Sequence, residues 1–122
     1  MIRRLLFAAA ILPLAALAQI QVLRFDGTNE NPVGAFVDLG SVSPGDTLET
    51  RFRVRNIGAG AAVFQTLSMA GSGFRISTAP SLPYTIAPGS EAEFRVAFNP
   101  MFIGTYSAFL LVNTINITCA GA

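Results

Sequence analysis

Three residue types are missing, because the 122 residues include no histidine, no lysine and no tryptophan. Without histidine and lysine there is no conventional catalytic triad, no Schiff-base amine and no imidazole base. A single cysteine, Cys119, excludes an internal disulfide. We expect Cys119 to be a strand residue near the C-terminus; the alternatives are a disulfide to another chain and a catalytic nucleophile.

A strong net charge is also missing. Eight basic residues stand against seven acidic ones, and loss of Arg3 and Arg4 with an N-terminal segment would leave a charge of −1. A near-neutral chain exerts no long-range attraction on nucleic acid or anionic lipid. Arg51, Arg53 and Arg55 form a positive stripe, but most aromatic residues fall on the inward parity of their predicted strands. We therefore expect no nucleic-acid partner.

The first 18 residues have the pattern of a secretory signal peptide. Arg3 and Arg4 are followed by the apolar run Leu5 to Leu17, and Ala16–Leu17–Ala18 forms a small-x-small cleavage site before Gln19. A signal anchor is disfavoured because the apolar run is about 13 residues long, short of the roughly 20 that span a bilayer. We predict a signal-peptide helix at residues 1–18 and one domain at residues 19–122. The protein would be exported to the periplasm, cell surface or medium, without a membrane span after cleavage.

Helix signals are scarce after residue 18, whereas glycine and proline recur at short intervals. This spacing predicts an all-β, immunoglobulin-like antiparallel β-sandwich of about seven to eight strands. The clearest strand follows Pro44–Gly45. Its inward positions are Leu48, Thr50, Phe52 and Val54, and its outward positions are Glu49, Arg51, Arg53 and Arg55. Such alternation is typical of a half-buried strand.

The stretch SPGDTLETRFRVRN at residues 43–56 returns in outline as APGSEAEFRVAFNP at residues 87–100. Proline followed by glycine suits a type II turn, because proline presets φ and glycine accepts a positive φ. The outward residues of the two following strands complement each other: Arg51, Arg53 and Arg55 against Glu91, Glu93 and Arg95. We predict antiparallel neighbours joined by cross-strand ion pairs. Chance similarity of two unrelated turns is the alternative.

Residues that could carry chemistry are few. Glu91 and Glu93 share an outward strand face beside arginines, which favours a solvated face over an acid/base site. The segment DGTNENP, residues 26–32, offers oxygen ligands without the spacing of a calcium loop, and an Asn- and Asp-rich turn explains it. Asn116–Ile117–Thr118 is a glycosylation sequon on which we expect no glycan. We assign no catalytic, cofactor-binding or metal-binding residue and expect no cofactor.

Four stretches together resemble a known family: VDLGSVSPGDTLETRFRVRNIGAG, GSGFRIS, YTIAPGSEAEFRVAFNP and GTYSAFLLV. They are similar to the Ig-like domains called ASH or hydin-like, which are related to the major sperm protein and PapD-like sandwiches. In exported bacterial proteins such domains are often labelled choice-of-anchor D. The resemblance covers residues 37 to about 120. It implies a sandwich that binds proteins or acts as a scaffold beside other domains.

We therefore expect a non-enzymatic exported module for protein binding or structural scaffolding, belonging to a larger cell-envelope or secreted protein. The alternative is a periplasmic chaperone or assembly factor of the PapD-like type. Because an edge strand can add a strand from a partner, we expect the edges at Ile20–Phe25 and Ile115–Cys119 to be exposed. Residues 58–60 and 71–73 are the expected mobile loops, and Tyr106 is a candidate tyrosine corner.

Overall fold

A computed structural model describes residues 19–122, and within this range the regular secondary structure is entirely β. The strands are β1 (Ile20–Phe25), β2 (Glu30–Pro32), β3 (Phe36–Asp38), β4 (Leu48–Asn56), β5 (Ala62–Phe64), β6 (Leu67–Ala70), β7 (Phe74–Thr78), β8 (Tyr84–Ile86), β9 (Glu91–Phe98), β10 (Tyr106–Val112) and β11 (Ile115–Gly121). The predicted signal-peptide helix at residues 1–18 lies outside the described residues. In residues 19–122 there is no helix long and apolar enough to cross a membrane.

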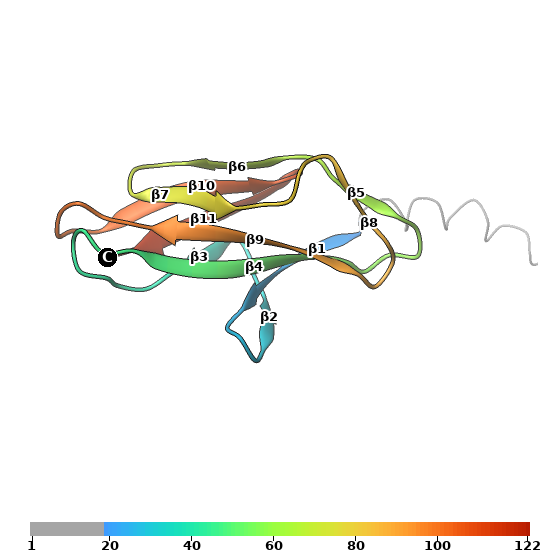
Figure 1. The fold of residues 1–122 in the computed structure, drawn as a ribbon, viewed down its shortest axis with the longest axis horizontal. Helices are drawn as coiled ribbons and strands as arrows, with labels where there is room; N and C mark the ends of the chain where they lie inside the picture. The colour runs from blue at the N-terminus through green and yellow to red at the C-terminus, as the bar shows by residue number, and fades with distance from the viewer. Residues whose placement is uncertain (1–18) are drawn as a thin grey trace, which may run out of the picture.

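Two sheets form a sandwich (Figure 1). The five-stranded sheet has the order β2-β1-β4-β9-β7, the four-stranded sheet has the order β3-β11-β10-β6, and β5 and β8 pair separately. The predicted all-β sandwich is confirmed, with two differences. Eleven strands replace the expected seven to eight, and four of them are only three residues long. The four-stranded sheet is mixed, since β3 runs parallel to β11.

The core lies between the two sheets and is built from the predicted inward positions. Phe52 of β4 and Phe94 of β9 are fully buried and stack with ring centroids 5.3 Å apart. Phe64 of β5 packs on Phe94 at 6.2 Å. The four-stranded sheet contributes buried residues such as Leu110 and Ile117. The alternation of apolar and charged residues in β4 therefore does set which face is buried.

Both Pro-Gly turns form as predicted. Asp46 donates its N–H to the Ser43 carbonyl at 3.0 Å, and Ser90 donates to the Ala87 carbonyl at 3.0 Å. Gly45 and Gly89, the third residue of each turn, have φ values of 89° and 78°. This is the region that glycine accepts without strain.

The two turns also explain why the sequence pattern occurs twice. Gly45 donates to the carbonyl of Pro100, just beyond β9, and Gly89 donates to the carbonyl of Asn56, the last residue of β4. Each turn is thus tied to the end of the other strand. The two copies are related as antiparallel partners, and chance similarity is not needed to account for them.

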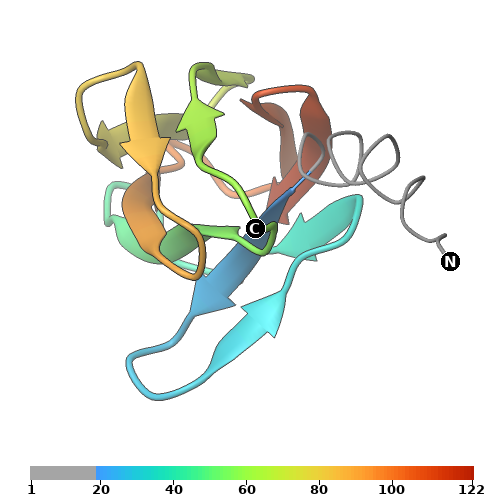
Figure 2. The ribbon, with the colours of Figure 1, turned by 90° about the vertical axis from the view of Figure 1, so that its right-hand side faces the viewer.

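The ends of the described chain lie at opposite ends of the sandwich (Figure 1). Gln19 accepts a hydrogen bond from Ile57, near the end that carries β5 and β8. Ala122 donates to Gly40 and accepts from Val42, at the far end. Seen from the β5–β8 end, the hairpin of β1 and β2 stands out from the side of the sandwich (Figure 2).

Candidate functional site on the two sheet faces

The outward face of the five-stranded sheet carries alternating arginine and glutamate side chains, here named the Arg/Glu ladder. Its members are Glu30, Glu49, Arg51, Arg53, Arg55, Glu91, Glu93 and Arg95. The register of β4 and β9 places Arg53 opposite Glu93 and Arg55 opposite Glu91. Ion pairs join both couples, the first with 3.3 Å between Arg53 Nε and Glu93 Oε1. The predicted antiparallel pairing with cross-strand ion pairs is confirmed.

Glu93 offsets the repulsion between two arginines that the register places opposite each other. Arg51 lies opposite Arg95, and Glu93 binds both, at 3.0 Å from Arg51 Nη2 and 3.1 Å from Arg95 Nε. Hydrogen bonding by Arg51, followed by that of Arg95, lowers the pKa of Glu93 from 4.5 to about 2. This carboxylate is therefore ionised near neutral pH, where it offers no proton for general acid catalysis.

Two members of the charged face were not foreseen from the sequence. Glu30 of β2 lies 2.9 Å from Arg53 Nη1 and also pairs with Arg55. The ring of Phe25 lies against the guanidinium groups of Arg53 and Arg51, at 3.6 Å and 4.5 Å from the ring centroid. A three-residue strand gives no periodic signal, although the Asn- and Asp-rich turn before it is a sign of a hairpin. With four arginines and four glutamates, the ladder is neutral.

The outward face of the four-stranded sheet is nearly uncharged, and we name it the Phe face. Cross-strand pairing aligns Phe36, Thr118, Phe109 and Ala70 in one row over β3, β11, β10 and β6. The side chains of Phe36 and Phe109 are 61% and 64% exposed. The adjoining outward positions are Ser68, Ser107, Leu111, Asn116 and Ala120. The one charged residue, Asp38, lies at the margin and accepts a hydrogen bond from Gly40 N–H.

A second exposed apolar group lies in the loop between β9 and β10. Met101, Phe102 and Ile103 are exposed by 67%, 77% and 92%. The hydroxyl of Tyr106 donates to the carbonyl of Phe102 at 2.7 Å and accepts from its N–H at 3.3 Å. The predicted role of Tyr106 as a packing device is confirmed, because this bond back to the preceding loop is what defines a tyrosine corner.

The remaining chemical candidates occupy structural positions. Cys119 is fully buried on β11, and burial raises the pKa of its thiol to about 11, so it is protonated near neutral pH. Asp26 Oδ1 accepts hydrogen bonds from the N–H groups of Thr28 and Asn29, which accounts for the Asn- and Asp-rich segment as a turn. Over residues 19–122 no three His, Cys, Asp or Glu side chains cluster closely enough to hold a metal ion.

The predicted sheet edges are wrong. β1 lies between β2 and β4, and β11 lies between β3 and β10. The outermost strands are β2, β7, β3 and β6, all of five residues or fewer. Nothing in the sequence indicated that β2 is a strand or that β3 pairs with β11, and these two strands cover the two that had been taken as edges. Mobility of residues 58–60 and 71–73 stays a prediction.

The segment that runs from just before β3 into β11 matches a recognised sequence family. The family model described as HYDIN/CFA65/VesB-like, Ig-like domain matches residues 34–118. The chain belongs to this family. The hydin-like and ASH resemblance is thereby confirmed, while the choice-of-anchor D label stays a prediction. The HYDIN/CFA65/VesB-like match leaves out β1 and β2, which supply Phe25 and Glu30 to the charged face. No curated protein sequence matches the chain.

Solved structures share the sandwich at low sequence identity. A protein of unknown function from Porphyromonas gingivalis W83 aligns with a TM-score of 0.59 at 17% identity over 88% of this chain, which spans only 48% of that protein. The ASH/PapD-like domain 7 of human CEP192 aligns with a TM-score of 0.55 at 9% identity, over 99% of this chain and 91% of that domain. A family 123 glycoside hydrolase from Clostridium perfringens gives 0.52 at 13% identity, over 71% of this chain and 22% of that enzyme. At such identities the likeness shows the fold alone.

Proposed function

We propose that this chain is a non-enzymatic, exported Ig-like module that binds a protein or joins neighbouring domains within a larger cell-envelope or secreted protein. The observation that carries the proposal is the Phe face, where Phe36 and Phe109 lie more than half exposed in one cross-strand row. Exposed aromatic residues on a surface with few charges are typical of the central part of protein interfaces.

The contrast between the two sheet faces supports the choice of surface. Arginines and glutamates of the ladder are already paired with one another, so a partner would have to break those pairs to use them. The Phe face presents no such pairs, and covering its two phenylalanines removes apolar area from water. A protein partner therefore gains more binding free energy by docking on the Phe face than on the ladder.

Three features of the described residues support a non-enzymatic role. The chain has no histidine or lysine to act as a base. The thiol of Cys119 is buried and protonated near neutral pH, and Glu93 is held ionised by arginines. The PapD-like chaperone alternative stays a prediction.

Site-specific photo-crosslinking tests the binding surface. A benzophenone amino acid replaces Phe109, and in a matched control it replaces Arg75, an exposed residue of β7 in the other sheet. We expect irradiated cells to give a discrete protein adduct from position 109 and none from position 75. Absence of adducts at position 109, or equal adducts at both positions, would contradict the proposal.

Export is tested separately by the N-terminus of the protein recovered from fractionated cells. Cleavage after Ala18 leaves Gln19 as the first residue in the envelope or the medium. Intact Met1 in a cytoplasmic fraction would show that the export proposal is wrong. That result would leave the proposed role of the Phe face standing.

A further inference from the structure

A hollow opens in the side of the sandwich where β1 stops short of the start of β4. β1 pairs with β4 only as far as Phe25 opposite Arg51, whereas β9 pairs along β4 to Leu48. The first three residues of β4 therefore have a strand neighbour on one side and none on the β1 side. The space left there is about 220 Å³, and the turn at Asp26 and Gly27 forms its rim.

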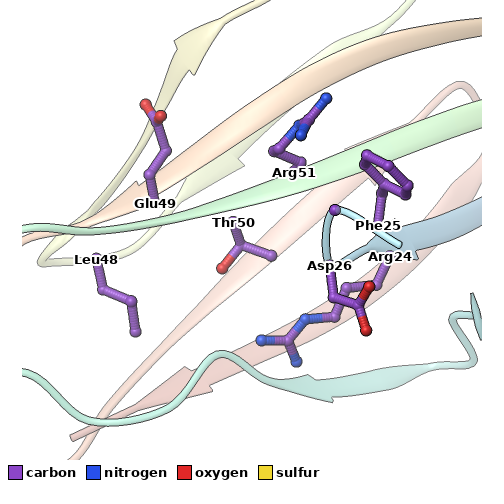
Figure 3. A pocket seen from close by; sticks show the side chains of 8 residues that line it. Arg24, Phe25, Asp26, Leu48, Glu49, Thr50 and Arg51 are labelled. Carbon is purple, nitrogen blue, oxygen red and sulfur yellow. The ribbon is translucent and has the colours of Figure 1, made fainter. Parts of the chain in front are cut away.

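Four side chains face this space from different directions (Figure 3). Leu48, Thr50, Asp26 and Arg24 surround it, while Glu49, Arg51 and Phe25 project to the other side of β4, toward the ladder. Arg24 Nη1 donates to the backbone carbonyl of Asp38 at 2.8 Å, which anchors the guanidinium group. Its other N–H groups make no hydrogen bond to residues 19–122.

Thr50 supplies a second unused donor. Its side chain is at an inward position of β4 and only 6% exposed, yet its hydroxyl makes no hydrogen bond within the described part of the chain. The next inward positions, Phe52 and Val54, are apolar. A buried hydroxyl without a partner costs free energy, and an acceptor atom placed in the hollow would recover it.

We propose that this hollow binds a carboxylate group, with the Arg24 guanidinium and the Thr50 hydroxyl as its donors. A planar guanidinium edge is matched to the two oxygens of a carboxylate. Asp26 at the rim has Oδ1 occupied by Thr28 and Asn29 and is ionised, so it repels a dianion such as phosphate more strongly than a singly charged carboxylate. The ligand is a monocarboxylate, either a small free acid or the C-terminus of a peptide.

The hollow is independent of the Phe face and lies only partly within the family match, which includes Leu48 and Thr50. Arg24 and Asp26 precede residue 34, where the match begins. The charged donor of the proposal therefore lies outside the family match, and the proposal can fail without affecting the proposed function.

Titration of ¹⁵N-labelled protein tests the site, with the backbone amides of Gly27 and Thr50 as reporters. The probes are N-acetyl-trialanine with a free C-terminus, its C-terminal amide, and propionate. We expect saturable shifts with the free acid and none with the amide. Shifts with propionate as well would identify a small acid as sufficient, and shifts with the peptide acid alone would identify a peptide C-terminus. Equal shifts with acid and amide, or none with either acid, would overturn the proposal.

Substitutions locate the binding groups. Arg24→Gln is expected to weaken binding of whichever acid shifts the reporters by about tenfold or more, as for loss of a charge-assisted hydrogen bond. Arg75→Gln, which removes an exposed arginine outside the hollow, should leave the dissociation constant unchanged. Because Arg24→Gln also removes the bond to Asp38, the pair Thr50→Val and Thr50→Ser provides a second test. Val should weaken binding and Ser should preserve it; wild-type affinity in folded Thr50→Val and Arg24→Gln proteins would refute the assignment.

Discussion

Among single residues, Asn56 forms side-chain hydrogen bonds to three backbone groups. It is fully buried; its Nδ2 donates to the carbonyls of Gly60 and Ile86 at 2.8 Å each, and its Oδ1 accepts from Gly58 N–H at 2.9 Å. Asn56→Ala leaves these groups without a partner, so we expect a loss of about 2–4 kcal/mol in the free energy of unfolding. Urea denaturation measures it. Asn116→Ala, at an exposed position of β11, should change stability by less than about 0.5 kcal/mol.

Removing the hydroxyl oxygen of Tyr106 tests the two hydrogen bonds that it makes to Phe102. Tyr106→Phe keeps the ring, which packs edge-on against Phe98, and deletes both hydrogen bonds to Phe102. We expect a loss of about 0.5–1.5 kcal/mol in thermal or urea unfolding. Tyr84→Phe is the matched control, because the Tyr84 hydroxyl makes no hydrogen bond to residues 19–122. Equal effects of the two substitutions would show that the bonds to Phe102 add no stability.

For strands, the pairing of β4 with β9 predicts how stability depends on pH. The folded-state pKa of Glu93 is depressed from 4.5 to about 2, chiefly by Arg51. The contribution of ionised Glu93 to the free energy of unfolding is therefore complete above about pH 4.5 and is lost as the pH falls toward 2. Glu93→Gln should lower stability at pH 7 and flatten the decline between pH 4.5 and 2, as measured by urea denaturation across this range. Asp46→Asn, outside the ladder, should retain the slope; an unchanged slope in Glu93→Gln would contradict the prediction.

How far the sequence predicted these strands depended on their length. β4 and β9 are eight residues or longer, so their alternation was visible and their faces, turns and mutual pairing were all predicted correctly. β2 and β3 have three residues each, too few for the alternation to indicate which strands they pair with. Their positions depend on tertiary pairing. The sequence therefore did not indicate that Glu30 joins the ladder or that β2 and β3 cover β1 and β11. The hollow beside Thr50 was not predicted either, since it depends on the register in which β1 pairs with β4.

At the scale of the whole molecule, the two sheets are in close contact where Gly121 of β11 meets the Phe98 ring of β9. A Cβ atom at Gly121 would lie 2.6 Å from Cε2 of the Phe98 ring, which is itself fully buried between Phe74 and Tyr106. Gly121→Ala should therefore lower stability by about 1–3 kcal/mol, because the ring must shift in a packed core. Gly34→Ala, with open space around its Cβ, is the control. A change of the same size in both variants in urea denaturation would argue against the contact.

Mutual neutralisation within the ladder has a kinetic consequence. Four arginines cancel four glutamates on one side of the molecule, and the Phe face has a single carboxylate at its margin. These two faces produce little long-range electric field. A protein partner would therefore reach the Phe face by diffusion without electrostatic steering, with an association rate constant of about 10⁵–10⁶ per molar per second. The rate of encounter should hardly change with ionic strength, and the lifetime of the complex would then decide how tightly it is held.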